Sequence, residues 1–449
     1  MHSKSFSISI NKRINPFKSI TKVDSDKSLS IRSFLIGSIS QNISTVRNVL
    51  ESEDVKSTIQ TCRKLGAKIK RVKPQSYVIH GKGLGSFFAK KNTSLNFGNS
   101  GTLARLLIGI LSTTPNIEVK IKGDHSLNKR SMKKLIELMK KFGAFFYPEK
   151  KYKFPLKMIS SEIPIGINYD SGVSAQLKSA VIFAGLNSFG MTNIIENKSS
   201  RDHTENLLMQ NKKVIRISKD KLKKIQIYGR KCLYPINISI GGDPSSAAFF
   251  TALTLLNQKS SIIIKNVGLN PTRTGFYEIL KKNKAKIRFI NLKKENNEVR
   301  GDIVVKTSKL KPMNTKAELY PKTTDEYLLL FVLAGLTNGV SSFKGISDLS
   351  NKESSRAYEM KKILDQLGIK SKLYKNEMKI FGKGMLNASN KKLYVKNLGD
   401  HRVAMCAFIL GILTGANTII KGFETVFTSS PSFLKIMRSL GAKFEIKKN

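Results

Sequence analysis

The feature that most constrains this fold is a short pattern in which a helix-like segment ends at a small or polar residue and a strand-like segment follows. The pattern is clear at Gly66, Gly143, Gly368 and Gly441 and weaker at Asn211 and Asn283. Its copies lie about 70–85 residues apart, so about six of them fill the chain. We expect each glycine or asparagine to end a helix. This period is too long for a solenoid and predicts βαβαββ modules.

A second recurring feature is a loop rich in Gly, Ser and Asp that precedes an apolar helix. Within 95–105, Gly98 and Gly101 permit backbone angles that other residues avoid. Ser100 or Thr102 is placed to cap the helix, and Arg105 follows about one turn later. One such loop alone usually indicates only a helix cap. Comparable loops, nearly all of which carry Lys or Arg, occur at 26–32, 123–132, 170–179, 200–205, 242–248, 352–356 and 400–405. If the modules pack their helices in parallel, many helix N-termini converge on one face and favour a multiply charged anion.

The length and the apolar runs predict a soluble protein of more than one domain. At 449 residues the chain is too long for one ordinary core, and we expect two domains of about 200 residues each. Leu328–Leu336 and Val403–Leu413 fall short of the ~18 residues of a membrane span and are predicted to be buried helices. Cys62, Cys232 and Cys406 fit neither a disulfide framework nor a zinc site, which indicates a reducing cytoplasm.

The net charge of +48 attracts polyanions or small anionic substrates. The lysines are scattered as pairs, and no helix-turn-helix or RNA-recognition signature accompanies them, so we do not expect a nucleic-acid partner. Base-composition bias also explains the abundance of lysine. The alternation at Phe6–Ile10 predicts a strand, so the basic N-terminus is interpreted as mature sequence rather than a targeting peptide.

Taken together, the loops form an ordered set of motifs. They are Asp-Lys-Ser, Asn-Ser-Gly-Thr, Ser-Ala-Gln-x-Lys-Ser-Ala, Arg-Asp-His-Thr-Glu, Gly-Asp-Pro-Ser-Ser-Ala-Ala, Lys-Glu-Ser and Asp-His-Arg-x-Ala-Met. In this order they make the chain resemble the EPSP synthase (3-phosphoshikimate 1-carboxyvinyltransferase) family from Asp26 to Gly441. The resemblance implies an α/β fold, a two-domain inside-out α/β barrel in which each domain has three βαβαββ repeats and helix N-termini face the interdomain cleft. Domain 1 is expected at residues 1–26 and 246–449, and domain 2 at residues 27–245.

The resemblance also implies an activity. The enolpyruvyl group of phosphoenolpyruvate is transferred to the 5-hydroxyl of shikimate 3-phosphate, and phosphate is released through a tetrahedral intermediate, in the shikimate pathway of aromatic amino-acid biosynthesis. Both substrates are small anions with a phosphate and a carboxylate, which suit arginine forks and helix N-termini. We expect a cytoplasmic monomer that has no metal or organic cofactor and associates with neither nucleic acid nor membrane.

The same resemblance assigns roles by motif position. Shikimate 3-phosphate is expected to contact Lys27, Ser28, Arg32, Ser174, Ala175, Gln176, Arg201, Asp325 and Lys352. Phosphoenolpyruvate is expected to contact Lys27, Gly101, Arg130, Gln176, Arg356 and Arg402. The expected catalytic residues are Asp325 as general base and Glu353 as proton carrier, assisted by Lys27 or Lys352. Residues 242–248 are expected to be structural, with Asp243 as a cap and Pro244 at the first helical position.

Several positions depart from the family pattern. They are Asp24-Ser25 in place of Pro-Gly, Ile31 in place of His, Ser131 in place of Pro, Ser355 in place of Asp and Ser430 in place of Phe. None removes a charged group expected to touch a substrate. Ser355 removes a carboxylate that would orient Arg356, which predicts a less efficient enzyme. The Ser-Ala-Gln and Arg-Asp-His-Thr-Glu segments resemble the class II branch of the family.

Three other functions stay open at this point. The substitutions are compatible with a degenerate, inactive paralogue that binds substrates without turnover. The charge is compatible with a polyanion-binding protein, which would gather its basic residues on one face. The sister enolpyruvyl transferase that acts on UDP-N-acetylglucosamine typically carries a cysteine in the loop that corresponds to 123–132, and this loop has none.

Overall fold

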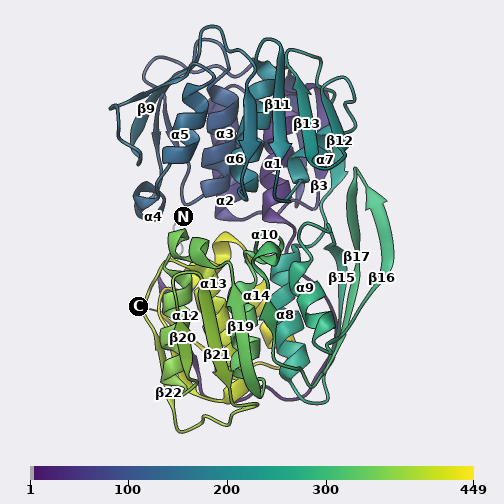
Figure 1. Ribbon diagram of the computed structural model, residues 1–449, viewed down its shortest axis with the longest axis vertical. Coiled ribbons are helices and arrows are strands. Elements are labelled where there is room, and N and C mark those ends of the chain that lie inside the picture. The colour runs from purple at the N-terminus through teal and green to yellow at the C-terminus, as the bar shows by residue number, and fades with distance from the viewer. Residues whose placement is uncertain (1–4, 449) are drawn as a thin grey trace. The chain divides into compact units, whose positions relative to one another are not determined.

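The computed structural model describes residues 5–448, which form two compact units. Unit 1 comprises Met1–Asp24, Gly241–Lys293 and Val299–Asn449, and unit 2 comprises Ser25–Ile240 and Lys294–Glu298. Figure 1 shows the helices and strands of both units along the colour ramp. No helix among the described residues is long and apolar enough to cross a membrane.

Among residues 5–448, six sheets of four strands repeat one topology. In unit 2, β6 (Ser94–Asn96) is parallel to β7 (Glu118–Lys122), and β9 (Leu156–Ile159) is antiparallel to both β7 and β8 (Phe145–Tyr147). Helix α3 (Gly101–Leu111) joins β6 to β7, and α4 (His125–Lys129) and α5 (Lys133–Lys140) lead to β8. This is a βαβαββ module, as the sequence period predicts.

Two further modules are also continuous in sequence. The first, in unit 2, contains β10 (Asn168–Ser171), α6 (Ala175–Asn187), β11 (Met191–Glu196), α7 (His203–Leu208), β12 (Ile215–Lys219) and β13 (Lys223–Tyr228). The second, in unit 1, contains β18 (Asn314–Thr315), α10 (Tyr320–Thr323), α11 (Tyr327–Gly335), β19 (Gly339–Lys344), α12 (Arg356–Gln366), β20 (Ser371–Leu373) and β21 (Glu377–Gly382).

The remaining three sheets each take one strand from a distant part of the chain. In unit 2, β14 (Asn237–Ser239) completes the sheet of β3 (Gln41–Arg47), β4 (Lys68–Lys73) and β5 (Ser76–Lys82). In unit 1, β2 (Lys18–Lys22) joins β15 (Ser261–Gly268), β16 (Lys286–Glu295) and β17 (Glu298–Lys306). Also in unit 1, β1 (Phe6–Ile10) lies between β23 (Asn417–Ile420) and β24 (Glu445–Lys448), next to β22 (Lys392–Val395). The predicted strand at Phe6–Ile10 is therefore confirmed.

Each of these three modules also contains two helices. They are α1 (Lys27–Ile39) and α2 (Glu53–Lys64) in unit 2, and α8 (Pro244–Leu256), α9 (Gly275–Lys282), α13 (His401–Thr414) and α14 (Phe433–Ser439) in unit 1. The first helix of each module is the more deeply buried one.

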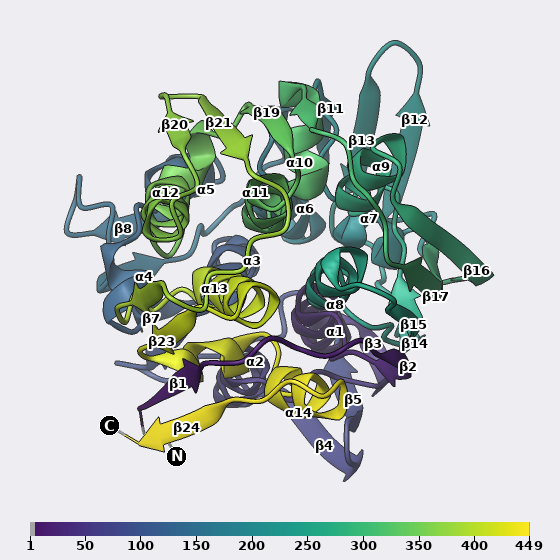
Figure 2. The ribbon, with the colours of Figure 1, turned by 90° about the horizontal axis from the view of Figure 1, so that it is seen from below.

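Helices occupy the inside of each unit and sheets its outside. In unit 1, α8, α11 and α13 contact one another, and every residue of the three is buried. Figure 2 shows these three helices nearly end-on, with the sheets of unit 1 around them. In unit 2, α3 packs against α1 and α6. A helix buried on all sides needs no polar stripe, which explains why Leu328–Leu336 and Val403–Leu413 read as continuous apolar runs.

The predicted helix-ending glycines are confirmed at four modules. Gly66, Gly143, Gly368 and Gly441 have φ between +72° and +91°, the left-handed region that favours glycine. Asn283 ends α9 as its C-cap, as expected, but it has φ −102°, and the next residue, Lys284, takes the left-handed conformation with φ +69°.

Substitution of these glycines tests the left-handed turns. Gly66→Ala and Gly441→Ala are each expected to lower the free energy of unfolding by roughly 1 kcal/mol, because L-residues avoid this conformation. No atom lies within 4 Å of an added Cβ at either position, so the cost is conformational rather than steric. Lys284→Gly is expected to raise stability slightly. Urea unfolding measures all three, and an unchanged midpoint for both alanine variants would contradict the prediction.

Candidate active site

Three helix N-termini lie together in unit 2. Asp26, Ser100 and Ser174 cap α1, α3 and α6, and each side chain accepts a hydrogen bond from the backbone amide three residues later at 2.8, 3.2 and 3.4 Å. Ser100 rather than Thr102 is therefore the cap of α3. Gln176, in the first turn of α6, donates through Nε2 to Thr102 Oγ1 at 3.0 Å, which joins the starts of α3 and α6.

Gly101 lies where two guanidinium groups converge. A Cβ at this position would come within 2.8 Å of Nη1 of Arg105 and 3.1 Å of Nη1 of Arg130. Gly98 has φ +57°, as expected, but Gly101 begins α3 with helical geometry, so it supplies space rather than an unusual backbone angle. Arg105 braces the loop, because its Nη1 donates to the Gly101 carbonyl at 3.1 Å and to Oε1 of Gln176 at 2.8 Å.

Neutral acceptors orient Arg130, the residue that ends α4. Its Nη2 donates to Oδ1 of Asn99 at 2.5 Å and to Oγ of Ser126 at 3.2 Å. Asn99 is in turn fixed by Asp124, whose Oδ2 accepts from Nδ2 at 2.7 Å. The Asn-Ser-Gly-Thr loop thus holds an arginine beside the start of α3, a geometry suited to an anion.

Arg32 is buried between three helices, with 3% of its surface exposed. Its Nε donates to Oγ1 of Thr204 at 2.8 Å, its Nη2 to Oγ of Ser179 at 3.3 Å and its Nη1 to the Ser28 carbonyl at 3.2 Å. These contacts bring α1, α6 and α7 to one point. Lys27, the first residue of α1, forms an ion pair with Asp54 at 3.0 Å.

The other predicted residues of unit 2 lie near these groups in sequence and structure. Ala175 is the first residue of α6, and half-buried Arg201 directly precedes the helix cap of α7, Asp202. Ser200 donates its backbone amide and its hydroxyl to Oε1 of Glu196 at 2.9 and 2.8 Å. Ser200 is therefore bound to the end of β11.

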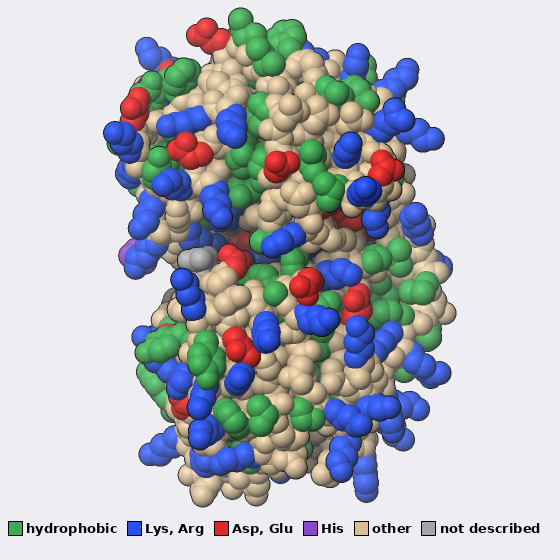
Figure 3. Space-filling view, in the orientation of Figure 1, with side chains coloured by type: hydrophobic (Ala, Val, Ile, Leu, Met, Phe, Trp, Pro, Cys, Tyr) green, Lys and Arg blue, Asp and Glu red, His purple; other side chains and the backbone are tan. Residues whose placement is uncertain are grey.

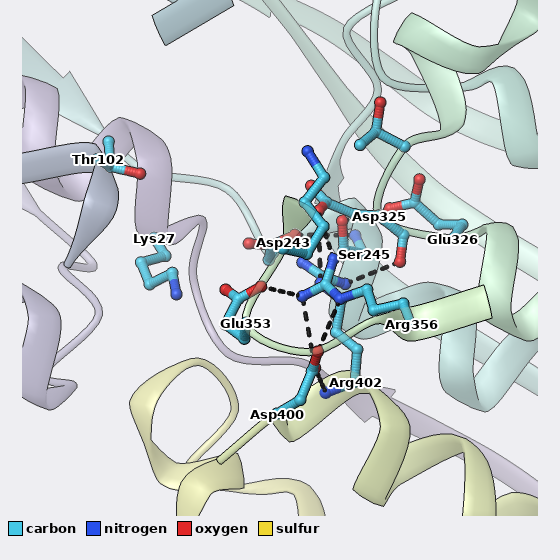
Figure 4. Close-up of polar contacts among 12 residues, drawn as sticks. Lys27, Thr102, Asp243, Ser245, Asp325, Glu326, Glu353, Arg356, Asp400 and Arg402 are labelled. Carbon is cyan, nitrogen blue, oxygen red and sulfur yellow. Dashed lines mark hydrogen bonds and ion pairs between the residues drawn. The ribbon is translucent and has the colours of Figure 1, made fainter. Parts of the chain in front are cut away.

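A second group of site residues surrounds Arg356 in unit 1, and we call it the Arg356 cluster: Asp325, Glu353, Arg356, Asp400 and Arg402. Arg356 is 2% exposed; its Nε donates to Oδ2 of Asp400 at 2.9 Å and its Nη2 to Oε2 of Glu353 at 2.6 Å (Figure 4). Burial alone would lower the pKa of Arg356, but Asp400, Glu353 and Asp325 together raise it. The guanidinium is therefore a permanent charge.

Asp325 lies between the two arginines of the cluster. Its Oδ1 is 3.4 Å from Nε of Arg402 and 4.0 Å from Nη1 of Arg356, and its backbone carbonyl accepts from Nη1 of Arg402 at 3.1 Å. The side chains of Asp325 and Glu353 are each 20% exposed. Two partly solvated carboxylates around fixed positive charges are suited to proton transfer.

Lys352 lies beside this cluster but bonds elsewhere. Its Nζ is 2.5 Å from Oδ2 of Asp348, which also accepts from the hydroxyl of Tyr320 at 3.2 Å. Burial and the neighbouring Asp348 raise the pKa of Tyr320. Asp348 lies outside the sequence motifs described above, so its bond to Lys352 could not be predicted from them.

The structure corrects the expectation for Ser355. Although Ser355 lacks a carboxylate, Arg356 is held by Asp400 and Glu353, and Ser354 donates to Oδ2 of Asp400 at 2.9 Å. The residue that orients Arg356 is therefore Asp400, which also caps α13 through the Arg402 amide at 3.0 Å. The sequence pattern indicated Asp400 as a helix start, but it did not predict the bond between Asp400 and Arg356.

In the segment 242–248 the expected cap and first helical residue are confirmed, and the segment has further partners. Asp243 accepts from the Ser245 amide at 2.8 Å and Pro244 opens α8. Buried Arg273 donates through Nη2 to Asp243 at 3.2 Å and to Ser245 Oγ at 2.9 Å. The Ser245 hydroxyl also bonds to Glu326, so this network adjoins Asp325.

Two of the departures from the family pattern contact each other. Oδ2 of Asp24 accepts from the Ser430 hydroxyl at 3.0 Å and from the Ser432 amide at 2.9 Å. Burial raises the pKa of Asp24 more than these bonds lower it, and Asp243 raises it further. Ser430 thus pairs with a carboxylate that occupies the position of a family proline.

Basic side chains are spread over the visible surface. Figure 3 shows Lys and Arg distributed over both units with acidic and apolar side chains between them. A polyanion-binding face would gather them in one place, so this view does not favour that function. Within residues 5–448, no group of three or more His, Cys, Asp and Glu is arranged to hold a metal ion.

Comparison with known proteins gives a consistent result. The sequence model of EPSP synthase (3-phosphoshikimate 1-carboxyvinyltransferase) matches residues 11–437. A 3-phosphoshikimate 1-carboxyvinyltransferase from Zymomonas mobilis is 34% identical over 441 residues, which cover 97% of each chain. The solved EPSP synthase of Acinetobacter baumannii has a TM-score of 0.85 and 32% identity and covers 98% of this chain and 100% of that chain. At 12% identity and a TM-score of 0.73, the enolpyruvyl transferase NikO from Streptomyces tendae shares the fold.

Asp24→Asn tests the buried carboxylate. Because the pKa of Asp24 is raised, the folded state binds its proton more tightly than the unfolded state, and ionisation lowers stability as pH rises through the raised pKa. Asparagine keeps an oxygen acceptor but does not ionise. The variant's gain in Tm over wild type, measured by calorimetry, is expected to be larger at about pH 8 than at about pH 4. The exposed Asp220→Asn is the control, and an equal gain at both pH values would contradict the prediction.

Proposed function

Because the chain belongs to the EPSP synthase family, we propose that both groups of site residues bind the anionic substrates of the family reaction and that the Arg356 cluster also transfers protons. The enzyme transfers the enolpyruvyl group of phosphoenolpyruvate to the 5-hydroxyl of shikimate 3-phosphate and releases phosphate. The oxygen of the hydroxyl forms a bond to C2 of phosphoenolpyruvate and loses its proton, while the methylene carbon gains one. Loss of phosphate and of a methyl proton from this tetrahedral intermediate then gives the product.

The observation that carries the proposal is the Arg356 cluster. Arg356 and Arg402 supply two fixed positive charges for the phosphate and carboxylate of phosphoenolpyruvate. Asp325 and Glu353 are the carboxylates beside them with part of their surface in solvent. In our proposal, Asp325 removes the hydroxyl proton and Glu353 delivers a proton to the methylene carbon and later accepts one back, with Lys27 or Lys352 assisting.

The residues of unit 2 are proposed to bind the anionic groups. Lys27, Ser28, Arg32, Ser174, Ala175, Gln176 and Arg201 are assigned to shikimate 3-phosphate, together with Asp325 and Lys352 of unit 1. Lys27, Gly101, Arg130 and Gln176 are assigned to phosphoenolpyruvate. This division is supported by the neutral acceptors around Arg130 and Arg32, which orient a guanidinium without neutralising it.

We also propose a cytoplasmic monomer. Cys62, Cys232 and Cys406 are all free thiols in the structure, which suits a reducing compartment. Size-exclusion chromatography with light scattering measures the oligomeric state directly, and a mass of about twice the 50.1 kDa chain would overturn the monomer.

The activity is tested by phosphate release from phosphoenolpyruvate, with and without shikimate 3-phosphate. Release is expected only when both substrates are present. Asp325→Asn keeps the size of the side chain but removes the base, and it is expected to lower kcat by at least about 100-fold. The matched control is Asp365→Asn, an exposed aspartate of α12.

Each outcome has a distinct meaning. Release that requires shikimate 3-phosphate but persists in Asp325→Asn would reject Asp325 as the base and keep the reaction. A folded wild-type protein that binds both substrates without turnover would instead indicate the degenerate paralogue.

A further inference from the structure

Unit 2 contains a buried group of four charges that no step of the reaction uses, and we call it the Lys178 cluster: Lys178, Glu196, Glu205 and Lys223. Nζ of Lys178 is 2.7 Å from Oε1 of Glu196 and 2.6 Å from Oε1 of Glu205. Lys223 approaches the same two carboxylates at 3.2 and 3.6 Å. The side chains of Lys178 and Glu205 are fully buried, whereas Lys223 is 22% exposed.

Such a cluster is costly to bury and is therefore a poor source of stability. Removing lysine and glutamate from water costs several kcal/mol per ion, and apolar residues of similar volume often replace such pairs without loss. Burial lowers the pKa of Lys178, but Glu205 and Glu196 together raise it, so the lysine is charged. What the cluster supplies is a fixed geometry between α6, the end of β11 and α7.

The contact between α6 and α7 that the cluster fixes also holds Arg32. Lys178 and Glu205 are bonded to each other, and their immediate neighbours Ser179 and Thr204 both accept hydrogen bonds from Arg32, at 3.3 and 2.8 Å. The two hydroxyls also bond to each other at 2.8 Å. Any shift of α7 along α6 would separate the hydroxyls that aim the guanidinium.

The cluster also reaches two further segments assigned to shikimate 3-phosphate. The Lys178 amide donates to the Ser174 carbonyl at 3.1 Å, so the lysine lies one helical turn below the cap. Glu196 accepts from the amide and the hydroxyl of Ser200, the residue before Arg201. One set of buried charges thus connects the segments that carry Arg32, Ser174 and Arg201.

We propose that the Lys178 cluster positions the shikimate 3-phosphate site, with Lys178 and Glu205 as positioning residues that act through Ser179, Thr204 and Ser200. This inference rests on the proposed role of Arg32, Ser174 and Arg201 in binding that substrate. It separates the cluster from the Gly101 and Arg130 region, which contacts none of its members in the bonds described above. Loss of the cluster should therefore affect one substrate and spare the other.

The test is the charge-matched double variant Lys178→Met with Glu205→Gln. It removes one charge of each sign and leaves Glu196 paired with Lys223 and Ser200, so the fold is not left with an uncompensated buried charge. Shikimate 3-phosphate affinity, measured by titration calorimetry on the full chain, is expected to fall at least about 10-fold. The KM for phosphoenolpyruvate at saturating shikimate 3-phosphate is expected to stay within about two-fold.

Three comparisons complete the experiment. Lys224→Met, the same substitution at the exposed neighbouring residue of β13, is expected to bind like wild type. A folded double variant with wild-type affinity for shikimate 3-phosphate would overturn the inference, and so would equal losses for both substrates, which indicate a general structural role. Arg32→Ala separates the inference from its premise: if this variant keeps full affinity, the proposed binding role of Arg32 is wrong and the inference falls with it.

Discussion

Burying a helix on every side confines its polar chemistry to its ends, and both units are built under this constraint. Every residue of α8, α11 and α13 is buried inside unit 1, so backbone amides at the helix starts must find partners within the protein, as they do in the side chains of Asp243 and Asp400. Several of the site residues lie at helix starts: Lys27 and Ser28 on α1, Gly101 on α3, Gln176 on α6 and Arg402 on α13. The sheets that surround these helices exclude water from them and so allow them to be buried on every side.

The two units use arginine in different electrostatic settings. Arg130 donates to an amide oxygen and a hydroxyl, which orient its charge without cancelling it, and this suits an incoming anion. Arg356, by contrast, forms ion pairs with Asp400, Glu353 and Asp325, so its charge is balanced by carboxylates of the protein itself. The same residue type therefore meets neutral partners in one unit and carboxylates in the other.

Local sequence patterns predicted the modules, but they could not predict contacts between residues that are distant in the sequence. The period of the helix-ending glycines and the capped helix starts anticipated the βαβαββ units, because both depend on neighbours within a few residues. The bond of Asp400 to Arg356, 44 residues away, and that of Asp24 to Ser430, 406 residues away, depend on tertiary packing. The sequence also indicated Gly101 as a site residue for the wrong physical reason: the glycine makes room for two guanidinium groups instead of supplying an unusual backbone angle. The roles of the site residues came from the family resemblance and stay predictions.

The place of β1 has a consequence for the order in which the protein acquires its structure. Most of unit 2 is one continuous segment, Ser25–Ile240, that leaves the ribosome before most of unit 1 exists. The strand β1 belongs between β23 and β24, which are synthesised last, so its backbone waits through almost the whole of translation for its hydrogen-bond partners. During that interval both edges of β1 lack their partner strands, and closing the loop to those partners carries the entropy of a very long stretch of chain. The sheet of β1 is thus one of the last parts of unit 1 that can form, because it needs strands from both sides of a very long stretch of chain.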